Sequence, residues 1–366
     1  MIHRTETALL QQIIEKDRKM AFLSGPRQVG KTTLTHIYRK RFDQTSYLNW
    51  DVRPDKKKIL TDPYFFEKEN RDPRKPFLVV LDEIHKYHDW KNYLKGAFDR
   101  YHEEFRFLIT GSGRLELFKK GGDSLFGRYF SVPLFPLTMG ELHGRLSSLN
   151  DFKKYLNHPP EPSQASWKRY ENLFRFSGFP EPFSVAKASF YNRWFSERKD
   201  LLLREDIRDA TGVRQLSLLE NLAHLIPERV GSSLSLNTLR QDIGVAFETI
   251  RDWLLILEQF FYLFRVTPFT GNLARTLRKG SKAYLFDWAE IDNEGARFEN
   301  LVASHLLKAV HFWTDRGLGD YGLWFVRDKE KRETDFLVTR NHVPWFLIEV
   351  KFSHKVSISK NLFYFQ

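Results

Sequence analysis

The residues with the clearest chemistry form a glycine-bracketed loop that ends in Lys31 and Thr32. The pattern G-x-x-x-x-G-K-T is typical of a loop that wraps a nucleoside triphosphate with inward-pointing backbone N–H groups. We expect the ammonium group of Lys31 to hold the β- and γ-phosphates and the hydroxyl group of Thr32 to bind Mg²⁺, with Thr33 at the α-phosphate. The predicted ATP-binding residues of this loop are Gly25, Pro26, Arg27, Gln28, Val29, Gly30, Lys31, Thr32 and Thr33.

Two acidic residues, Asp82 and Glu83, end an apolar run that starts at Lys75. This is the pattern of a buried parallel strand with a site at its carboxyl end. In a Walker B arrangement Asp82 orients Mg²⁺ through its water shell, and Glu83 polarises the water that attacks the γ-phosphate. The alternative is a strand end with two solvated acids, but a phosphate loop roughly 50 residues earlier favours the catalytic interpretation.

A third polar strand end follows at Thr110, in the sequence Thr-Gly-Ser-Gly-Arg. Either Thr110 or Ser112 would lie beside the γ-phosphate and sense it by hydrogen bonding. The alternative is a glycine turn with Arg114 in solvent.

These residues need a sheet whose strands end at one edge. An amphipathic helix over residues 5–19 precedes the first strand, and apolar residues at helical spacing follow the loop. Alternation of strands and helices predicts an α/β fold with a doubly wound parallel sheet. The expected strands cover residues 20–23, 46–51, 75–83, 105–110 and 128–134.

Residues 216–269 have the pattern of a helix-turn-helix followed by a strand, with Gly244 at the turn. The second helix, residues 248–258, carries three acids against one Arg251, which favours structural or protein–protein use over DNA reading. A basic flank follows and could track a phosphate backbone without reading sequence. Between residues 265 and 282 it has no acid and five basic residues, Arg265, Arg275, Arg278, Lys279 and Lys282.

The last part of the chain predicts a helix from Gly295, followed by strands over residues 323–327, 333–339 and 345–352. Asp335 lies in the middle of a strand, and period-two alternation puts Glu349 and Lys351 on one face of the next. This pattern resembles the PD-(D/E)xK nuclease core. The resemblance implies that Asp335 and Glu349 bind a divalent metal, Glu299 completes the metal shell and Lys351 positions or activates water. An ordinary amphipathic hairpin with a Glu–Lys pair is the alternative.

The chain as a whole resembles the prokaryotic AAA-type P-loop ATPases that carry a winged-helix segment and a nuclease-like C-terminal domain. The resemblance implies ATP hydrolysis and a five-stranded core in which the strand bearing Thr110 separates the Walker A and Walker B strands. It also puts Arg128 at the family's Gly-Arg motif, with a catalytic contact to phosphate. The matching motifs are Gly25–Thr33, Leu81-Asp82-Glu83, Ile109-Thr110-Gly111-Ser112 and Phe126-Gly127-Arg128 with Pro136-Leu137.

We expect four parts, namely an AAA-type P-loop ATPase domain at 1–155, a helical lid or linker at 156–215, a winged-helix domain at 216–281 and a nuclease-like domain at 282–366. Only 15 residues follow Lys351, whereas the resemblance implies a further helix and strand, so we expect the last domain to be truncated.

The composition bears on partners. A net charge of +12 suggests an anionic partner, nucleic acid such as double-stranded DNA first, with a protein partner as the alternative. The chain has no cysteine, which excludes disulfides and thiolate metal sites. It has no apolar run of about 18 residues, so we expect a cytoplasmic protein that does not enter a membrane. The oligomeric state stays open, as does the source of an arginine finger, for which Arg114 and Arg128 are candidates.

The leading hypothesis is a cytoplasmic ATPase that uses ATP and Mg²⁺, and whose nucleotide state switches the winged-helix and nuclease-like module. One alternative is an ATP-gated, metal-dependent nuclease. The other is a nucleotide-regulated scaffold that binds nucleic acid or protein with little catalysis.

Overall fold

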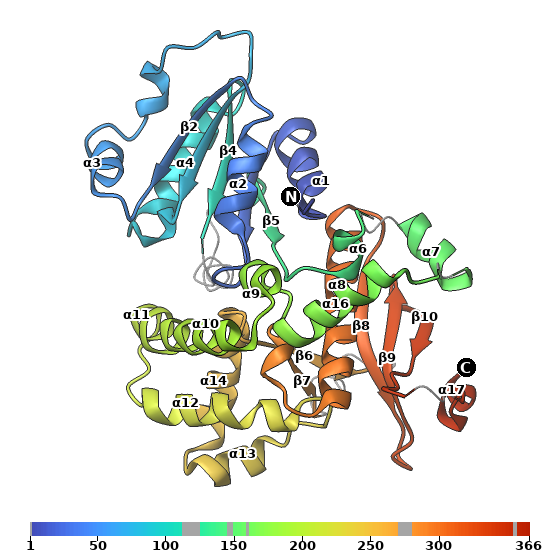
Figure 1. The fold of residues 1–366 in the computed structure, drawn as a ribbon. Helices are drawn as coiled ribbons and strands as arrows, with labels where there is room; N and C mark the ends of the chain where they lie inside the picture. Colours follow the sequence, from blue (N-terminus) through green and yellow to red (C-terminus); the bar gives the residue numbers. More distant parts are fainter. Residues whose placement is uncertain (1, 112–124, 145–148, 159–160, 270–279, 354–356) are drawn as a thin grey trace. The chain divides into compact units, whose positions relative to one another are not determined.

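The computed structural model describes residues 2–111, 125–144, 149–158, 161–269, 280–353 and 357–366. The chain divides into two compact units, residues 3–135 and residues 136–366 (Figure 1). Each unit has its own five-stranded sheet.

The sheet of the first unit is parallel throughout, in the order β2-β3-β4-β1-β5. The strand that bears Thr110, β4, lies between β1 and β3, so the Walker A and Walker B strands are separated as expected. The predicted fold class of this region is confirmed. The strands are β1 (Met20–Ser24), β2 (Gln44–Asn49), β3 (Phe77–Asp82), β4 (Phe105–Thr110) and β5 (Tyr129–Pro133).

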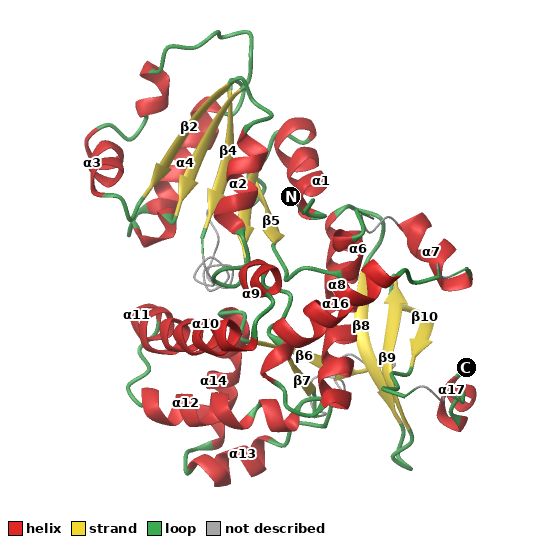
Figure 2. Cartoon of the chain, in the orientation of Figure 1, coloured by secondary structure: helices red, strands yellow, loops and turns green. Residues whose placement is uncertain are grey.

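Helices pack on both faces of this sheet (Figure 2). The buried side chains of α4 join Phe22, Phe107 and Ile109 in one aromatic core. Successive strand residues point to opposite faces, so Val80 and Leu108 face the other side, where α2 contacts β3 and β4. Burial on both faces explains why β3 and β4 are apolar along nearly their whole length. The helices are α1 (Glu6–Gln11), which continues as a π-helical turn (Gln12–Lys16), α2 (Lys31–Arg39), α3 (Arg53–Thr61) and α4 (Trp90–Tyr101).

The sheet of the second unit is mixed, in the order β10-β9-β8-β6-β7. Strands β6 and β8 are parallel, and the other neighbours are antiparallel. The sheet therefore spans the boundary expected at residues 281 and 282. Its strands are β6 (Leu263–Pro268), β7 (Lys282–Leu285), β8 (Tyr321–Arg327), β9 (Glu333–Arg340) and β10 (Val343–Ile348).

In the second unit, α12, α13 and α14 gather at one end and β8, β9 and β10 at the other (Figure 2). The predicted helix-turn-helix segment consists of α13 and α14 with Gly244 between them, left-handed at φ 77°. The helices are α6 (Met139–Leu142), α7 (Leu149–Asn157), α8 (Gln164–Phe176), α9 (Pro180–Val185), α10 (Ala188–Asp200), α11 (Arg208–Ala210), α12 (Leu216–Leu225), α13 (Leu236–Ile243), α14 (Phe247–Gln259), α16 (Glu294–Asp315) and α17 (Lys360–Phe365).

Polar contacts fix α6 to α16 inside the second unit. The ammonium group of Lys308 lies 2.7 Å from a carboxylate oxygen of Glu141, and both side chains are buried. The ring Nε2 of His305 accepts a hydrogen bond from the backbone N–H of Met139 at 3.0 Å. Burial lowers the pKa of His305 to about 4, so this imidazole is neutral at pH 7.

Candidate functional site

The predicted phosphate loop connects β1 to α2 in the first unit. Its backbone is left-handed at Gln28 (φ 61°) and Gly30 (φ 100°), and Gly30 is the N-cap of α2. At Gly25 φ is 145°, and a Cβ atom there would lie 2.4 Å from the carbonyl oxygen of Leu134. Glycine is therefore required at position 25 on both conformational and steric grounds.

The ammonium group of Lys31 lies against the loop itself, 2.9 Å from the carbonyl oxygen of Gly25 and 2.8 Å from that of Pro26. Thr32 and Thr33 are exposed in the first turn of α2. The N-terminal segment supports this loop, because the buried Arg4 donates hydrogen bonds to the carbonyl oxygens of Val29 and Phe135. This loop suits a bound triphosphate and its Mg²⁺, because it combines two exposed hydroxyl groups, a lysine and a helix N-terminus.

Asp82 lies at the carboxyl end of β3, beside Thr110 of β4 and Asn49 of β2 in the strand register. Hydroxyl groups donate to both of its carboxylate oxygens, Tyr47 to Oδ2 at 2.5 Å and Thr110 to Oδ1. Burial and the hydrogen bond to Asp82 raise the pKa of Tyr47 well above its ordinary value, so Tyr47 stays a donor. The orientation of Asp82 is thus fixed from the two strands that flank β3.

Glu83 follows in a left-handed conformation (φ 56°), and its backbone N–H donates to the carbonyl oxygen of Thr110 at 3.0 Å. Burial raises the pKa of its carboxyl group, while the ammonium groups of Lys86 and Lys31 lower it in part. Lys86 Nζ lies 3.5 Å from Glu83 Oε2 and 2.5 Å from Asp51 Oδ2. A carboxylate with a raised pKa next to the phosphate loop is suited to accept a proton.

Two residues predicted for this site, Arg128 and Ser112, are not found in it among the described residues. Arg128 precedes β5 and pairs with Met20 at the amino end of β1, whereas the phosphate loop follows the carboxyl end of β1. Its guanidinium group forms an ion pair with Asp99, at 2.6 and 2.9 Å. The expected phosphate contact of Arg128 in this site is therefore wrong, because the length of the parallel strand separates the two. Ser112 lies outside the described residues.

The predicted nuclease-like residues converge in the second unit. Asp335 Oδ2 accepts a hydrogen bond from the backbone N–H of Val350 at 2.7 Å, and Lys351 Nζ lies 2.6 Å from Glu349 Oε1. Strand β10 ends at Ile348, so Glu349 and Lys351 follow the strand rather than continue it, and the N–H of Val350 between them bonds to a side chain. Glu299 comes to the same place from α16, where Tyr284 donates to its Oε1 at 2.7 Å.

The most buried member of this cluster is Lys282 of β7. Its Nζ lies 2.7 Å from Glu333 Oε1, 3.5 Å from Glu299 Oε1 and 3.9 Å from Asp335 Oδ1. Lys282 is therefore used in internal ion pairs. Arg265 is also paired internally, through two 2.7 Å bonds to Glu258. Neither residue forms part of the expected basic flank. The other basic residues of that flank lie outside the described residues.

The pKa values of the carboxyl groups in this cluster are shifted in different directions. Burial raises the pKa of Asp335, although the N–H of Val350 and the ammonium of Lys282 lower it in part. Burial also raises the pKa of Glu299. For Glu349 burial is outweighed by hydrogen bonds from Lys351 and Ser359, which leave its pKa below the ordinary value. Over the residues that the structure describes, no three His, Asp or Glu side chains have metal-site spacing.

Sequence reasoning missed three residues that support these sites. Tyr47 lies on β2 and gave no motif, but its alternation with Asn49 on a strand next to the Walker B strand was a usable signal. Arg4 precedes the first helix and could not be connected to the loop from sequence. In the sequence Lys282 stands out only as one of a series of basic residues.

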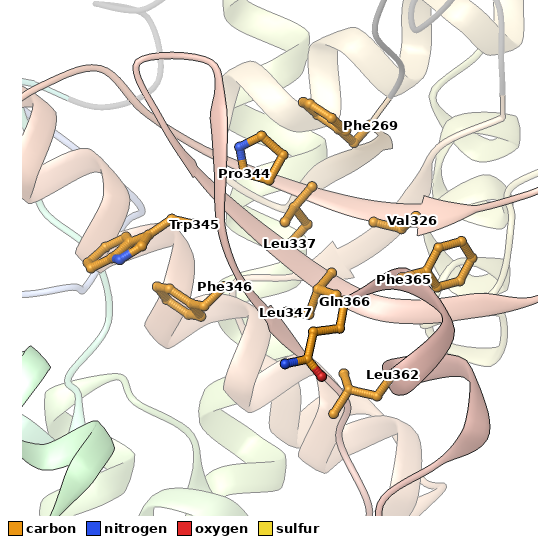
Figure 3. A pocket seen from close by; sticks show the side chains of 10 residues that line it. All are labelled: Phe269, Val326, Leu337, Pro344, Trp345, Phe346, Leu347, Leu362, Phe365 and Gln366. Carbon is orange, nitrogen blue, oxygen red and sulfur yellow. The ribbon is translucent and has the colours of Figure 1, made fainter.

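The second unit also has an apolar pocket of about 610 Å³ between the sheet and α17 (Figure 3). Its lining includes Leu337, Trp345 and Leu347 from the sheet and Leu362 and Phe365 from α17. Apart from Gln366, the described residues that line it are apolar. In the described part of the chain, no helix is both long and apolar enough to cross a membrane.

Comparison with known proteins agrees with the fold of the first unit. Residues 17–143 match a family profile described as an AAA domain, which contains the phosphate loop, Asp82 and Glu83. This match supports an AAA-type nucleotide-binding domain in the first unit. Residues 168–289 and 294–365 match two domains of unknown function, DUF8612 and DUF4143. The second sheet takes β6 and β7 from the former and β8, β9 and β10 from the latter.

Whole-chain relatives include uncharacterized proteins of Mycobacterium bovis and Mycobacterium tuberculosis. Each is 26% identical over 359 residues, covering 94% of this chain and 72% of the relative. Solved structures similar to the chain include the replication initiator DnaA bound to AMPPCP and single-stranded DNA, with 15% identity, a TM-score of 0.33 and coverage of 70% of this chain and 86% of that chain. Another is a STAND protein with a tetratricopeptide repeat sensor from Pyrococcus horikoshii, with 14% identity, a TM-score of 0.32 and coverage of 84% and 45%. At these TM-scores no functional argument follows from the two structures.

Proposed function

We propose that the AAA-type domain of this chain binds ATP with Mg²⁺ and hydrolyses it. The observation that carries this proposal is the meeting of three polar strand ends at one edge of the parallel sheet. The phosphate loop follows β1, Asp82 and Glu83 end β3, and Thr110 ends β4. This arrangement supports a site in which Glu83 is the general base, Asp82 orients the metal and the loop holds the phosphates.

Each residue then has a distinct part in the reaction. Lys31 and the loop N–H groups bind the phosphates, and Thr32, with Asp82 acting through water, would hold the Mg²⁺ that neutralises phosphate charge. Glu83 accepts a proton from the attacking water as that water's oxygen bonds to the γ-phosphorus and ADP departs. Tyr47 and Thr110 keep both oxygens of Asp82 in place.

The direct test compares Lys31→Ala and Glu83→Gln with the intact chain. Lys31→Ala should abolish ATP binding, measured by titration with a fluorescent ATP analogue. Glu83→Gln should bind ATP but lose about 10²- to 10⁴-fold in turnover, since it removes the general base. Lys57→Ala, an exposed lysine of α3, is the matched control and should behave as the intact chain. Normal turnover by Glu83→Gln would refute the assignment of the base.

We further propose that the nucleotide state switches the second unit, and that nucleic acid is its partner. The net charge of +12 supports an anionic partner. The internal pairing of Arg265 and Lys282 weakens this argument for the flank that contains them. The test is steady-state ATP hydrolysis with and without double-stranded DNA at several salt concentrations. Stimulation that falls steeply with salt would support nucleic acid, because binding releases counterions. Hydrolysis indifferent to DNA would instead favour a protein partner.

Metal-dependent cleavage is the second candidate, because Glu299 and Asp335 both lie near Lys282, and Glu349 pairs with Lys351 close to Asp335. One feature opposes it, since the ammonium group of Lys282 lies among the same carboxylates. We therefore propose that the second unit binds its partner without cutting it. Cleavage of DNA or RNA with Mg²⁺ or Mn²⁺ that is lost in Asp335→Ala would overturn this.

A further inference from the structure

The side chain of Lys282 is almost fully buried, with 2% of its surface exposed. An ammonium group in such a place must be paired, because burying an isolated charge is very costly. Its three neighbours are Glu333, Glu299 and Asp335, at the distances given above. They come from two elements, α16 and β9, so Lys282 of β7 connects three parts of the unit.

The three carboxylates that surround Lys282 are themselves stabilised by its positive charge. Glu299, Glu333 and Asp335 keep only about a fifth to a quarter of their side-chain surface exposed, at 19%, 26% and 20%. Like charges held this close repel unless a cation lies between them. In metal-dependent nucleases a divalent ion neutralises negative charge of this kind.

Two further cations offset the negative charge of the carboxylate cluster. Lys351 pairs with Glu349 at 2.6 Å, and Arg327 approaches Glu333 at 3.7 Å. Together with Lys282 these supply three positive charges to four carboxylates. A cluster with so little net charge has a weak electrostatic demand for a divalent ion.

We propose that Lys282 is the resident cation of this cluster and takes the electrostatic role of a divalent metal, so that the cluster excludes Mg²⁺ and Mn²⁺. A metal ion would have to lie about 2.0 to 2.6 Å from carboxylate oxygens such as those of Glu299 and Asp335. The Nζ of Lys282 lies 3.5 and 3.9 Å from two of those oxygens, so metal and ammonium would be close and strongly repulsive. This inference concerns the second unit alone and stands whether or not the AAA-type domain hydrolyses ATP.

The experiment measures Mn²⁺ binding to the full chain, free of nucleotide, by electron paramagnetic resonance and by thermal melting with and without Mn²⁺. The intact chain should bind no Mn²⁺ in the second unit at millimolar concentration and should not be stabilised by it. The double variant Lys282→Met with Glu333→Gln removes one charge of each sign and keeps Glu299 and Asp335. It should bind one Mn²⁺ at least about a hundredfold more tightly than the intact chain, because the competing ammonium is gone.

Two controls identify the site. Adding Asp335→Ala to the double variant should remove the gained Mn²⁺ binding. Glu333→Gln alone keeps Lys282 and should gain none. The proposal is overturned if the folded double variant binds no Mn²⁺, since Lys282 is then not what excludes the metal.

A second measurement, the melting temperature of the intact chain with Mn²⁺, does not depend on whether a Lys282 variant folds. If Mn²⁺ raises the melting temperature of the intact chain and Asp335→Ala abolishes this rise, the cluster holds a metal with Lys282 in place and the proposal fails. No Mn²⁺-dependent rise at millimolar concentration supports it.

Discussion

Replacing Lys86 by Met should move the acid limb of ATP turnover to higher pH. Glu83 must be ionised to accept a proton, so turnover falls as the pH drops through its pKa. Burial raises the pKa of Glu83, and the ammonium group of Lys86 opposes this effect. Removing Lys86 therefore raises the pKa further, and turnover is lost at a higher pH than in the intact chain.

The size of the shift follows from the geometry. Lys86 Nζ lies 3.5 Å from Glu83 Oε2, and the two side chains are 30% and 22% exposed. A partly exposed pair of this kind contributes about 0.2 to 1 kcal/mol. Since one pKa unit equals about 1.36 kcal/mol, the pKa should rise by roughly 0.1 to 0.7 units. Asp51 would lose its 2.5 Å partner as well, and its repulsion of Glu83 acts in the same direction.

The assay is kcat for ATP hydrolysis between pH 5 and 8 at constant ionic strength. The shift in Lys86→Met should shrink in high salt, because screening weakens the charge interaction. Lys57→Met is the control, and its profile should overlie that of the intact chain. An acid limb that stays in place, or moves to lower pH, would refute the assignment of Glu83 as the base that Lys86 influences.

Three further predictions concern the framework of the two units. Gly25→Ala should weaken ATP binding at least about tenfold, because its Cβ would lie 2.4 Å from the carbonyl oxygen of Leu134; an unchanged affinity in an ATP-analogue titration would contradict this. Lys308→Met should lower the free energy of unfolding by about 3 to 5 kcal/mol, because it leaves the carboxylate of Glu141 buried without this partner. In urea unfolding, adding Glu141→Gln should recover most of the loss, and purely additive losses would argue against the pair. His305 has its pKa lowered to about 4, so the unfolded chain takes up this proton first as the pH falls below about 6.5. Stability should therefore fall by up to about 3 kcal/mol between pH 6.5 and 4, and unfolding curves of His305→Gln that show the same pH dependence would contradict this.

Most of the first unit could be predicted from sequence because its signals are local. The phosphate loop fixes a strand before it and a helix after it, and each acid or threonine that ends an apolar run fixes a strand end. Hence β4 has the expected bounds, and β1, β3 and β5 differ by one or two residues at their ends.

Two predictions were wrong, the phosphate contact of Arg128 and the length of the strand before Glu349. Both depend on residues far away in the sequence. The Gly-Arg motif of Arg128 implied a phosphate contact, but Arg128 lies at the amino end of β1 because it directly precedes β5, which runs parallel to β1. Strand β10 stops before Glu349, and just beyond its end the side chain of Asp335, not a strand backbone, accepts the N–H of Val350. No sequence pattern reveals such a competition between a side chain and a ladder.

The sequence by itself determined the chemistry that the AAA-type domain can offer, because the loop, the acids and the polar strand ends are each specified within a few residues. Only the tertiary structure decided which charges meet. Tyr47 reaches Asp82 across two neighbouring strands, and Lys282 reaches Glu299 and Asp335 from a different element. Ion pairs and buried hydrogen bonds depend on distances between chain segments far apart in sequence, and those distances are set only when the two sheets form.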